Sequence, residues 1–311
     1  MSDATFYELH GNGLIATEGP EATPFLHAQL TSDVAGLEVP ATQYSGYCAP
    51  DGRLLATFLL WRMPDRVMLL LPAALREAVQ ARLTRFVLRS KVRFSDATAE
   101  WTLFGVSGSG AAAVIAPFID PVPAAAHVSA VAAGMAVTRL PDGRLLVMVA
   151  PAQANALRAR LESAAQEAPE ASWARLDIEA GIPWITEQSQ DKYLPQMVNL
   201  DLIGGVSYRK GCYPGQEIVA RTHYLGRLKQ RMYRVAIAEG RAPERGDPLY
   251  SDAFGSAQAS GALLSIAPRA AGGYEALAVV QTKAAQAGTV HWKSPEGPAV
   301  TLQSLPYSIP D

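Results

Sequence analysis

The hexapeptide PDGRLL occurs twice in this chain, at residues 50–55 and 141–146. Pro-Asp-Gly is a turn signal, and the apolar residues after it are typical of a strand. In each copy a later apolar run meets a proline, Pro72 or Pro151, and an amphipathic pattern rich in Arg and Leu follows. The repeat therefore predicts two related subdomains, each a sheet with helices on one face. The alternative is that Asp-Gly turns and Pro-initiated helices are simply common.

The rest of the chain predicts a further, all-β domain. Its 311 residues exceed the usual single domain of about 150 residues. From Lys229 onward, short strand-like runs alternate with Gly, Pro and Asp, as in a β-sandwich or barrel. We therefore predict an α+β fold, with two sheet-plus-helix subdomains in residues 1–228 and a small C-terminal β-barrel in residues 229–311. Residues 173–179 are predicted as a strand, and residues 184–200 as loop.

Composition excludes several classes of protein. Apolar residues make up 49% of the chain, charged residues 18%, and the net charge is -2. These values are ordinary for a globular protein and create no general field for nucleic acid or anionic lipid. No signal-peptide pattern and no membrane-spanning run is found, so no membrane partner is expected. Cys48 and Cys212 lack a disulfide-framework spacing, which fits a cytoplasmic protein, although the sequence leaves open that the two thiols meet.

Residues 210–221, KGCYPGQEIVAR, concentrate reactive and turn-forming residues. Gly211, Pro214 and Gly215 are turn and breaker residues, so Cys212 is expected on a tight loop that a short helix follows. A thiol just before a helix N-terminus, with cationic side chains on both sides, is expected to have a lowered pKa. The alternative is an inert, buried cysteine that acts as a small apolar residue.

This segment resembles the signature K-G-C-[FY]-x-G-Q-E of the YgfZ-type folate-binding proteins, relatives of the aminomethyltransferase (T-protein) of the glycine cleavage system. Shorter pieces similar to the family follow in its order at residues 25–34, 88–92, 195–201 and 204–208. The resemblance implies the aminomethyltransferase folate-binding fold, with tetrahydrofolate or a folate derivative as cofactor. It also implies a role in assembly or repair of iron–sulfur enzymes, including those that thiolate tRNA. Folate and iron–sulfur client enzymes or assembly factors are then the expected partners.

The resemblance also implies a folate site. Glu179 matches the glutamate of the R-x-E-x-G pattern with which T-protein relatives bind the pterin edge, and Arg175 opens that pattern here. Tyr208 and Arg227 are further candidates for folate contacts, and the cations Arg175, Lys210, Arg221 and Arg227 suit its anionic tail. The alternative for Glu179 is a local cap or ion pair.

One departure separates this chain from the T-protein enzymes. Their pattern G-x-I-x-D-D carries the catalytic aspartate, whereas Ala56 and Thr57 occupy the two acidic positions here. Neither side chain exchanges a proton as a carboxylate does. An aminomethyltransferase reaction is therefore not expected, and whether the protein turns over any substrate is left open.

The residues of the Lys-Gly-Cys segment receive the following expected roles. Cys212 would act as a thiolate toward a cluster, a sulfur species or a one-carbon unit, with Lys210 lowering its pKa. Tyr213 would stack on a flat ligand. Gln216 and Glu217 would fix the loop through its backbone amides, and Arg221 would pair with Glu217 four residues away. The alternative for that pair is an ordinary surface contact. Gly211 and Gly215 shape the loop.

Metal and nucleic-acid sites have weaker support. The five histidines are scattered and no Cys-x-x-Cys occurs, so no metal site is predicted. An all-protein iron–sulfur cluster needs about four cysteines, so any cluster on Cys212 would take ligands from elsewhere. A basic stretch at residues 221–234, with Tyr224 and Tyr233 interleaved, suits an RNA-binding module. The rim of a folate pocket explains the same residues, so direct nucleic-acid binding is not expected.

Overall fold

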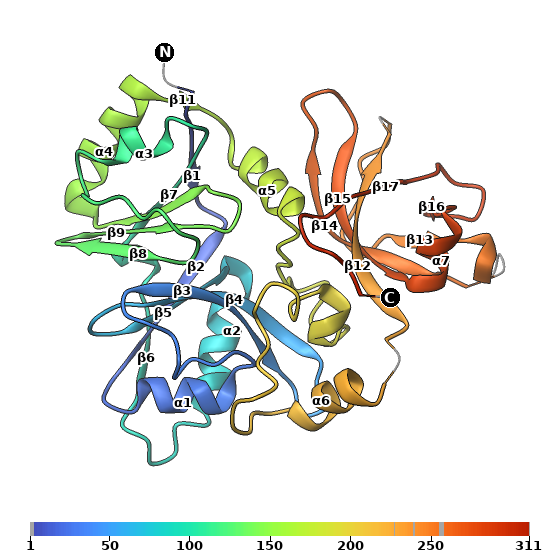
Figure 1. Ribbon diagram of the computed structural model, residues 1–311, viewed down its shortest axis with the longest axis horizontal. Helices are drawn as coiled ribbons and strands as arrows, with labels where there is room; N and C mark the ends of the chain where they lie inside the picture. Colours follow the sequence, from blue (N-terminus) through green and yellow to red (C-terminus); the bar gives the residue numbers. More distant parts are fainter. Residues whose placement is uncertain (1–2, 227, 239, 255–257, 311) are drawn as a thin grey trace. The chain divides into compact units, whose positions relative to one another are not determined.

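The computed structural model describes residues 3–226, 228–238, 240–254 and 258–310. The chain forms two compact units, each assembled from separate segments (Figure 1). Unit 1 comprises Met1–His27, Asp33–Gln43 and Phe58–Trp173. Unit 2 comprises Ala28–Ser32, Tyr44–Thr57 and Ala174–Asp311. Two short early segments thus belong to the same unit as the C-terminal part of the chain.

Unit 1 contains a six-stranded sheet, sheet A, with its core on one face. Its order is β11 (Gln166–Glu167), β1 (Thr5–Leu9), β7 (Thr102–Ser107), β10 (Leu145–Val149), β9 (Met135–Arg139) and β8 (Ser129–Ala132). All neighbours are antiparallel except β1 and β11. Alternate residues of β7 and β10 point to one face, where α3 (Ala111–Ile115) and α4 (Pro151–Ala164) cover them with side chains such as Leu157 and Leu161.

A second, five-stranded sheet, sheet B, contains the strands on both sides of the first PDGRLL turn. Its order is β3 (Ala41–Cys48), β4 (Leu54–Arg62), β5 (Val67–Pro72), β2 (Asn12–Glu18) and β6 (Arg93–Asp96). The helix α2 (Ala73–Thr84) packs on β2 and β6 and buries Leu75, Val79 and Leu83, four residues apart along one face. The short helices α1 (Ala22–Gln29) and η1 (Thr98–Glu100) complete this region.

The two PDGRLL turns have the same backbone hydrogen bonds. Gly52 and Gly143 have φ of 82° and 90°, the left-handed region that glycine adopts without a Cβ clash. Each glycine N–H donates to the carbonyl three residues earlier, at 2.9 Å in both copies. The residue before each proline donates to the carbonyl of the following arginine, at 2.8 Å in both. The surroundings differ: Arg53 is exposed and Gly52 buried, whereas Gly143 is exposed and Arg144 is buried 4.1 Å from the Trp173 ring centroid.

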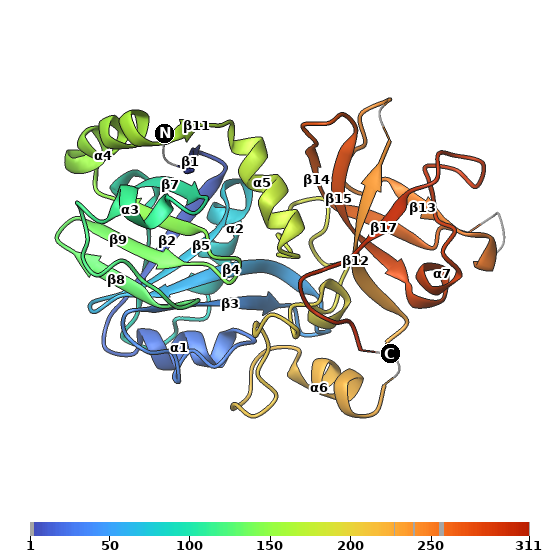
Figure 2. The same ribbon diagram turned by 45° about the horizontal axis from the view of Figure 1, so that its top comes forward.

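The C-terminal part of unit 2 forms a curled antiparallel sheet, sheet C (Figures 1 and 2). Its six strands run β16 (His291–Trp292), β13 (Pro248–Tyr250), β14 (Gly261–Pro268), β15 (Tyr274–Gln281), β12 (Gln230–Ile237) and β17 (Thr301–Gln303). Val300 N donates to Val290 O at 2.9 Å, and Trp292 N to Pro298 O at 2.9 Å. These bonds join the chain before β17 to β16, so the two ends of the sheet meet, as a small barrel requires. The helices α7 (Thr282–Ala287) and η3 (Asp252–Phe254) lie between strands.

Residues 173–179 are helical, so the predicted strand is wrong. They belong to α5 (Glu170–Glu179). The buried residues are Trp173, Asp177 and Ile178, the spacing of one helix face and not the alternation of a strand. The carboxylate of Asp177 is polar, and its burial is compensated by a hydrogen bond of 2.9 Å that it accepts from Trp184 Nε1. Within the predicted loop, η2 (Pro195–Val198) is the only helix among described residues 184–200.

A buried ion pair joins sheet C to the loop after η2. Arg231 of β12 donates from Nη1 and Nη2 to the two carboxylate oxygens of Asp201, at 2.8 and 3.2 Å. Arg231 Nη1 also donates to Gln196 O at 2.7 Å, and Asn199 Nδ2 donates to Met232 O at 2.8 Å. Both partners of the ion pair are almost excluded from solvent, so loss of one would leave an uncompensated buried charge.

Among the described residues, no helix has both the length and the apolar character needed to cross a membrane.

Candidate functional site

The Cys212 loop, residues 207–215, ends where α6 (Gln216–Tyr224) begins. Gly215 lies at the helix N-cap with φ of 81°, in the left-handed region. A Cβ added there would lie 2.6 Å from Ala49 O and 2.6 Å from Gly52 Cα. The loop therefore packs directly on the first PDGRLL turn at a point where only glycine fits. The prediction that Gly215 opens a short helix is confirmed.

The loop is anchored to the buried residue Thr31. Thr31 N donates to Gly46 O at 2.9 Å, and Thr31 Oγ1 accepts from Gly46 N at 2.7 Å. Its hydroxyl also donates to Gly205 O at 2.6 Å, and its carbonyl accepts from Ser207 N at 2.9 Å. Thr31 thus joins β3 to the start of the Cys212 loop. In the sequence, Thr31 belongs to the family-like piece at residues 25–34, and nothing in that pattern indicates this role.

Lys210 acts as a second anchor within the loop. Its Nζ donates to Leu30 O at 2.7 Å and lies 4.6 Å from the centroid of the Tyr213 ring. The ammonium group thus makes a hydrogen bond to the backbone at Leu30 and a cation–π contact with Tyr213 of the same loop. The described contacts of Lys210 therefore fix the loop, in addition to any effect of its charge on Cys212.

Tyr213 is buried, and this differs from the predicted stacking role. Its side chain is 6% exposed, and among the described residues its hydroxyl has no hydrogen-bond partner. Burial raises the pKa of this hydroxyl well above its usual range, with smaller contributions from Cys48 and Tyr208. The hydroxyl is therefore neutral at physiological pH, and Lys210 covers the ring where a flat ligand would stack.

The two cysteines lie in opposite environments, and both are free thiols. Cys48 is 1% exposed, and burial, assisted by the charge of Asp51, raises its pKa far above the usual range. Cys212 is exposed on the loop. The expectation that Cys212 is accessible, and not an inert core residue, is therefore confirmed, whereas Cys48 has the properties of the inert alternative.

The contacts at the start of α6 differ from both predicted roles. Gln216 Nε2 donates to the carbonyls of Lys210 and Gly211, each at 3.4 Å. Gln216 thus holds the loop, through backbone carbonyls and not through amides. Glu217 and Arg221 are both exposed, and within the described residues they form no ion pair with each other or with another group. Water solvates these two charges well, so their pairing gains little.

Tyr208, a predicted folate contact, belongs to an aromatic cluster at α6. Its ring stacks on His223 with centroids 3.7 Å apart and planes 12° apart. Tyr224 packs edge-on against both rings. Burial raises the pKa of Tyr208 above its usual range, and the charge of Asp201 adds to this rise. Arg227, the other candidate in this region, lies outside the described residues.

Glu179 and Arg175 are paired at the end of α5. Arg175 Nη1 donates to Glu179 Oε1 across one helical turn, and Arg234 Nη2 lies 3.8 Å from the same oxygen. The Glu179 side chain is 30% exposed, and Oε2 has no partner among the described residues. The local-pair alternative is therefore realised, yet one carboxylate oxygen remains able to accept from a donor such as a pterin edge. To accept two hydrogen bonds from a pterin edge, Glu179 would also need Oε1, which pairs with Arg175 and Arg234 in this structure.

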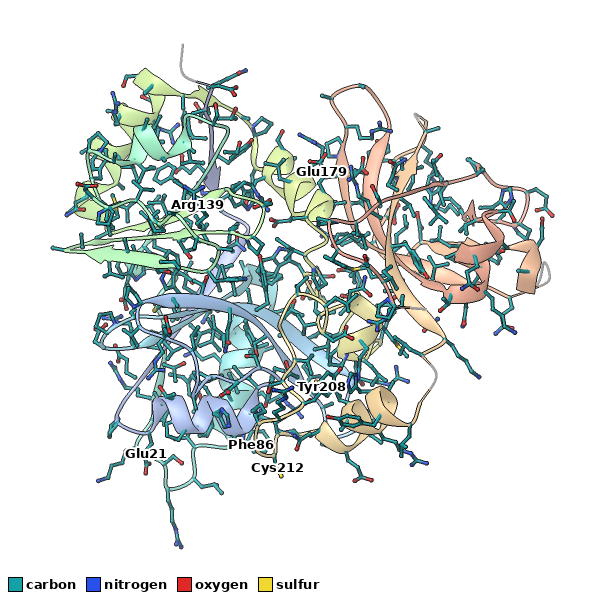
Figure 3. All side chains as sticks on the ribbon, in the orientation of Figure 1. Glu21, Phe86, Arg139, Glu179, Tyr208 and Cys212 are labelled. Atoms are coloured by element: carbon teal, nitrogen blue, oxygen red, sulfur yellow. The ribbon has the colours of Figure 1, made fainter. Side chains whose placement is uncertain are left out.

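Figure 3 shows how the predicted residues are distributed in unit 2. Tyr208 and Cys212 lie near α6, and Glu179 lies well away from them, beside sheet C. The hydrogen bonds of the Cys212 loop connect it to Thr31, Leu30 and Gln216. The bonds of Glu179 connect it to Arg175 and Arg234. The described contacts thus form two separate clusters, one around the thiol and one around Glu179.

Ala56 and Thr57 have structural roles. Ala56 is fully buried in β4. Thr57 Oγ1 donates to Pro183 O at 2.9 Å and accepts from Ile185 N at 3.0 Å. Both functions of this hydroxyl are therefore used by the backbone of one loop. Among the described residues, no group of three or more His, Cys, Asp and Glu side chains has the arrangement of a metal site.

The fit of Gly215 against the first turn predicts a strong effect of Gly215→Ala. Left-handed backbone costs a non-glycine residue about 1–2 kcal/mol, and overpacking against Ala49 adds about 1–3 kcal/mol. Gly204→Ala is the matched control, because Gly204 has φ of 77° and nothing within 4 Å of an added Cβ. The free energy of unfolding, measured in urea, should fall more for Gly215→Ala than for Gly204→Ala. Equal losses would contradict the described packing.

Comparison with known proteins agrees with this architecture. A model of the GCVT N-terminal domain matches residues 1–137. The solved structure of glycine cleavage system aminomethyltransferase T from Bartonella henselae aligns over 98% of this chain and 86% of its own, with a TM-score of 0.80 and 21% identity. This likeness shows that the fold is that of the aminomethyltransferases.

Sequence relatives identify the family within that fold. The tRNA-modifying protein YgfZ of Sodalis glossinidius (strain morsitans) is 30% identical and aligns over 98% of this chain and 93% of its own length. The protein of the same name from Edwardsiella ictaluri (strain 93-146) is 31% identical over 94% of this chain and 89% of its own. Near-complete coverage at this identity shows that the chain belongs to the YgfZ family.

Proposed function

We propose that this protein binds a folate and supports assembly or repair of iron–sulfur enzymes, including enzymes that modify tRNA, and that Cys212 is the reactive group. Relatives in its family are named tRNA-modifying proteins, which supports a role near tRNA modification. The observation that carries the proposal is the environment of Cys212. Its thiol is exposed, and the loop that bears it is fixed by Thr31, Lys210 and Gln216.

A fixed, exposed thiol suits transfer or ligation chemistry. A thiolate is a nucleophile and a soft metal ligand, and a loop fixed before binding loses less conformational freedom when a partner engages it. One thiol supplies one ligand of the roughly four that an iron–sulfur cluster requires. The proposal therefore assigns the remaining ligands to a client protein or a small thiol. Free cysteines also fit the reducing cytoplasm, where we place the protein.

The proposed folate contacts lie at Glu179. Its open oxygen Oε2 is suited to accept from the donor edge of a pterin, and Arg175 and Arg234 supply positive charge beside it. A bound folate would provide a reduced one-carbon carrier. We do not extend the proposal to aminomethyl transfer, because Ala56 carries no ionisable group and the hydroxyl of Thr57 is hydrogen-bonded on both sides.

The thiol part of the proposal predicts the phenotype of Cys212→Ala. In a bacterial strain lacking its own YgfZ-family gene, the wild-type chain should restore iron–sulfur enzyme activity and Cys212→Ala should not. Cys48→Ala is the matched control for loss of a thiol. Both variants should retain the wild-type affinity for tetrahydrofolate. Full restoration by Cys212→Ala, at equal protein level, would rule out the thiol as the working group.

The folate part predicts that Glu179→Gln weakens tetrahydrofolate binding. Loss of a hydrogen bond to a charged acceptor costs about 1.5–3 kcal/mol, which corresponds to roughly a ten- to hundredfold rise in Kd. Calorimetric titration measures this change. The exposed Glu187, changed to Gln, serves as the control and should bind as the wild type does. Unchanged affinity of Glu179→Gln would place any folate elsewhere.

A further inference from the structure

The outer side of α6 exposes apolar side chains. Among the described residues of unit 2, the exposed large hydrophobic residues are Ile218, Tyr224 and Leu225, at 37%, 64% and 84%. All three lie in α6 or directly after it, and α6 buries only Val219 fully. Ile218 and Leu225 are seven residues apart and therefore share one helix face. Clustered exposed apolar groups of this kind mark interaction surfaces.

The Tyr224 and Ile218 side chains and the backbone of Leu225 have fixed contacts within the protein. The Tyr224 ring packs edge-on against His223, with centroids 4.7 Å apart, and His223 stacks on Tyr208. Leu225 N donates to Arg221 O at 2.9 Å, which fixes the residue at the helix end. Ile218 lies against the first PDGRLL turn, because a Cβ added to Gly52 would lie 3.2 Å from the Cβ of Ile218. Such preorganisation lowers the entropy cost of association.

The chain segment that bears these apolar residues is positively charged. In residues 207–230 the cations are Arg209, Lys210, Arg221, Arg227 and Lys229, against the single acid Glu217, in a chain of net charge -2. Arg209, Arg221 and Lys229 are exposed, and they form no ion pair within the described part of the chain. The local charge is therefore opposite in sign to that of the whole protein.

We propose that the α6 surface, formed by Ile218, Tyr224 and Leu225 with Arg209, Arg221 and Lys229 around them, docks an acidic partner protein. An apolar centre with a charged rim is the anatomy of a protein–protein interface, and complementary charge sets its specificity and association rate. The aliphatic Ile218 and Leu225 favour a protein over RNA, because single-stranded RNA is bound by stacking on aromatic rings along a basic groove.

Hydrogen bonds of Gln216 join the docking surface to the thiol loop. Gln216, in the first turn of α6, donates to the carbonyls of Lys210 and Gly211, the two residues before Cys212. A partner seated on α6 would thus lie beside an exposed thiol. That the partner is the iron–sulfur client rests on the proposed function. The docking surface itself stands on the exposed apolar residues and the charge.

Photo-crosslinking in living bacteria tests the docking surface. A benzophenone amino acid is placed at position 225, or at position 39 as the control, because Val39 is 47% exposed in unit 1 beside the exposed acid Glu38. We expect adducts at position 225 that RNase does not remove, at several times the level at position 39. The protein in them, identified by mass spectrometry, should be acidic on the surface that crosslinks. Equal adducts at both positions, or adducts that RNase removes, would overturn the proposal.

Binding of the identified protein, purified, provides the quantitative test. Leu225→Glu and Arg221→Glu should each raise its Kd by about tenfold or more, and added salt should weaken wild-type binding. Arg160→Glu, on an exposed arginine of α4, should leave Kd unchanged. Unchanged Kd in Leu225→Glu would also overturn the proposal. If these variants lose binding and yet Cys212→Ala restores enzyme activity, the docking surface stands and the proposed thiol function fails.

Discussion

The environment of the thiol depends on the hydrogen bonds of Thr31. This residue is fully buried, and its amide, carbonyl and hydroxyl join Gly46 of β3 to Gly205 and Ser207, on either side of the start of the Cys212 loop. Segments far apart in the sequence are thereby held together by buried hydrogen bonds. A buried hydroxyl that lost these partners would leave several backbone groups unsatisfied, so the anchor holds the loop in one conformation.

Given this anchor, the loop's other features follow from simple chemistry. Lys210 contacts Leu30 O and the Tyr213 ring, and Tyr213 itself is buried. Gly215 allows the chain to approach the first PDGRLL turn before α6 begins. Between these fixed points Gly211 and Cys212 are exposed, and Cys212 is the one with a reactive side chain. This chain thus has the aminomethyltransferase fold, with Ala56 and Thr57 at the two positions where the resemblance to T-protein enzymes implies acidic residues.

Local sequence signals predicted much of this fold, because turns and short strands depend on nearby residues. Gly52, Gly143 and Gly215 adopt the left-handed backbone that their turn positions require. Contacts between distant segments were not predictable in the same way. The burial of Tyr213, the anchor at Thr31 and the helical state of α5 depend on partners remote in the chain. The expected Glu217–Arg221 pair failed because spacing permits an ion pair in water but hardly stabilises it.

Cys212 lies exposed on a fixed loop, whereas Cys48 is buried in the core. The most direct measurement is the stoichiometry and rate of modification by a thiol reagent such as a maleimide, in native buffer and in denaturant. The account predicts one rapidly modified cysteine in the native protein, lost in Cys212→Ser and kept in Cys48→Ser, and two in denaturant. A native protein in which Cys212 resists the reagent as strongly as Cys48 does would contradict it.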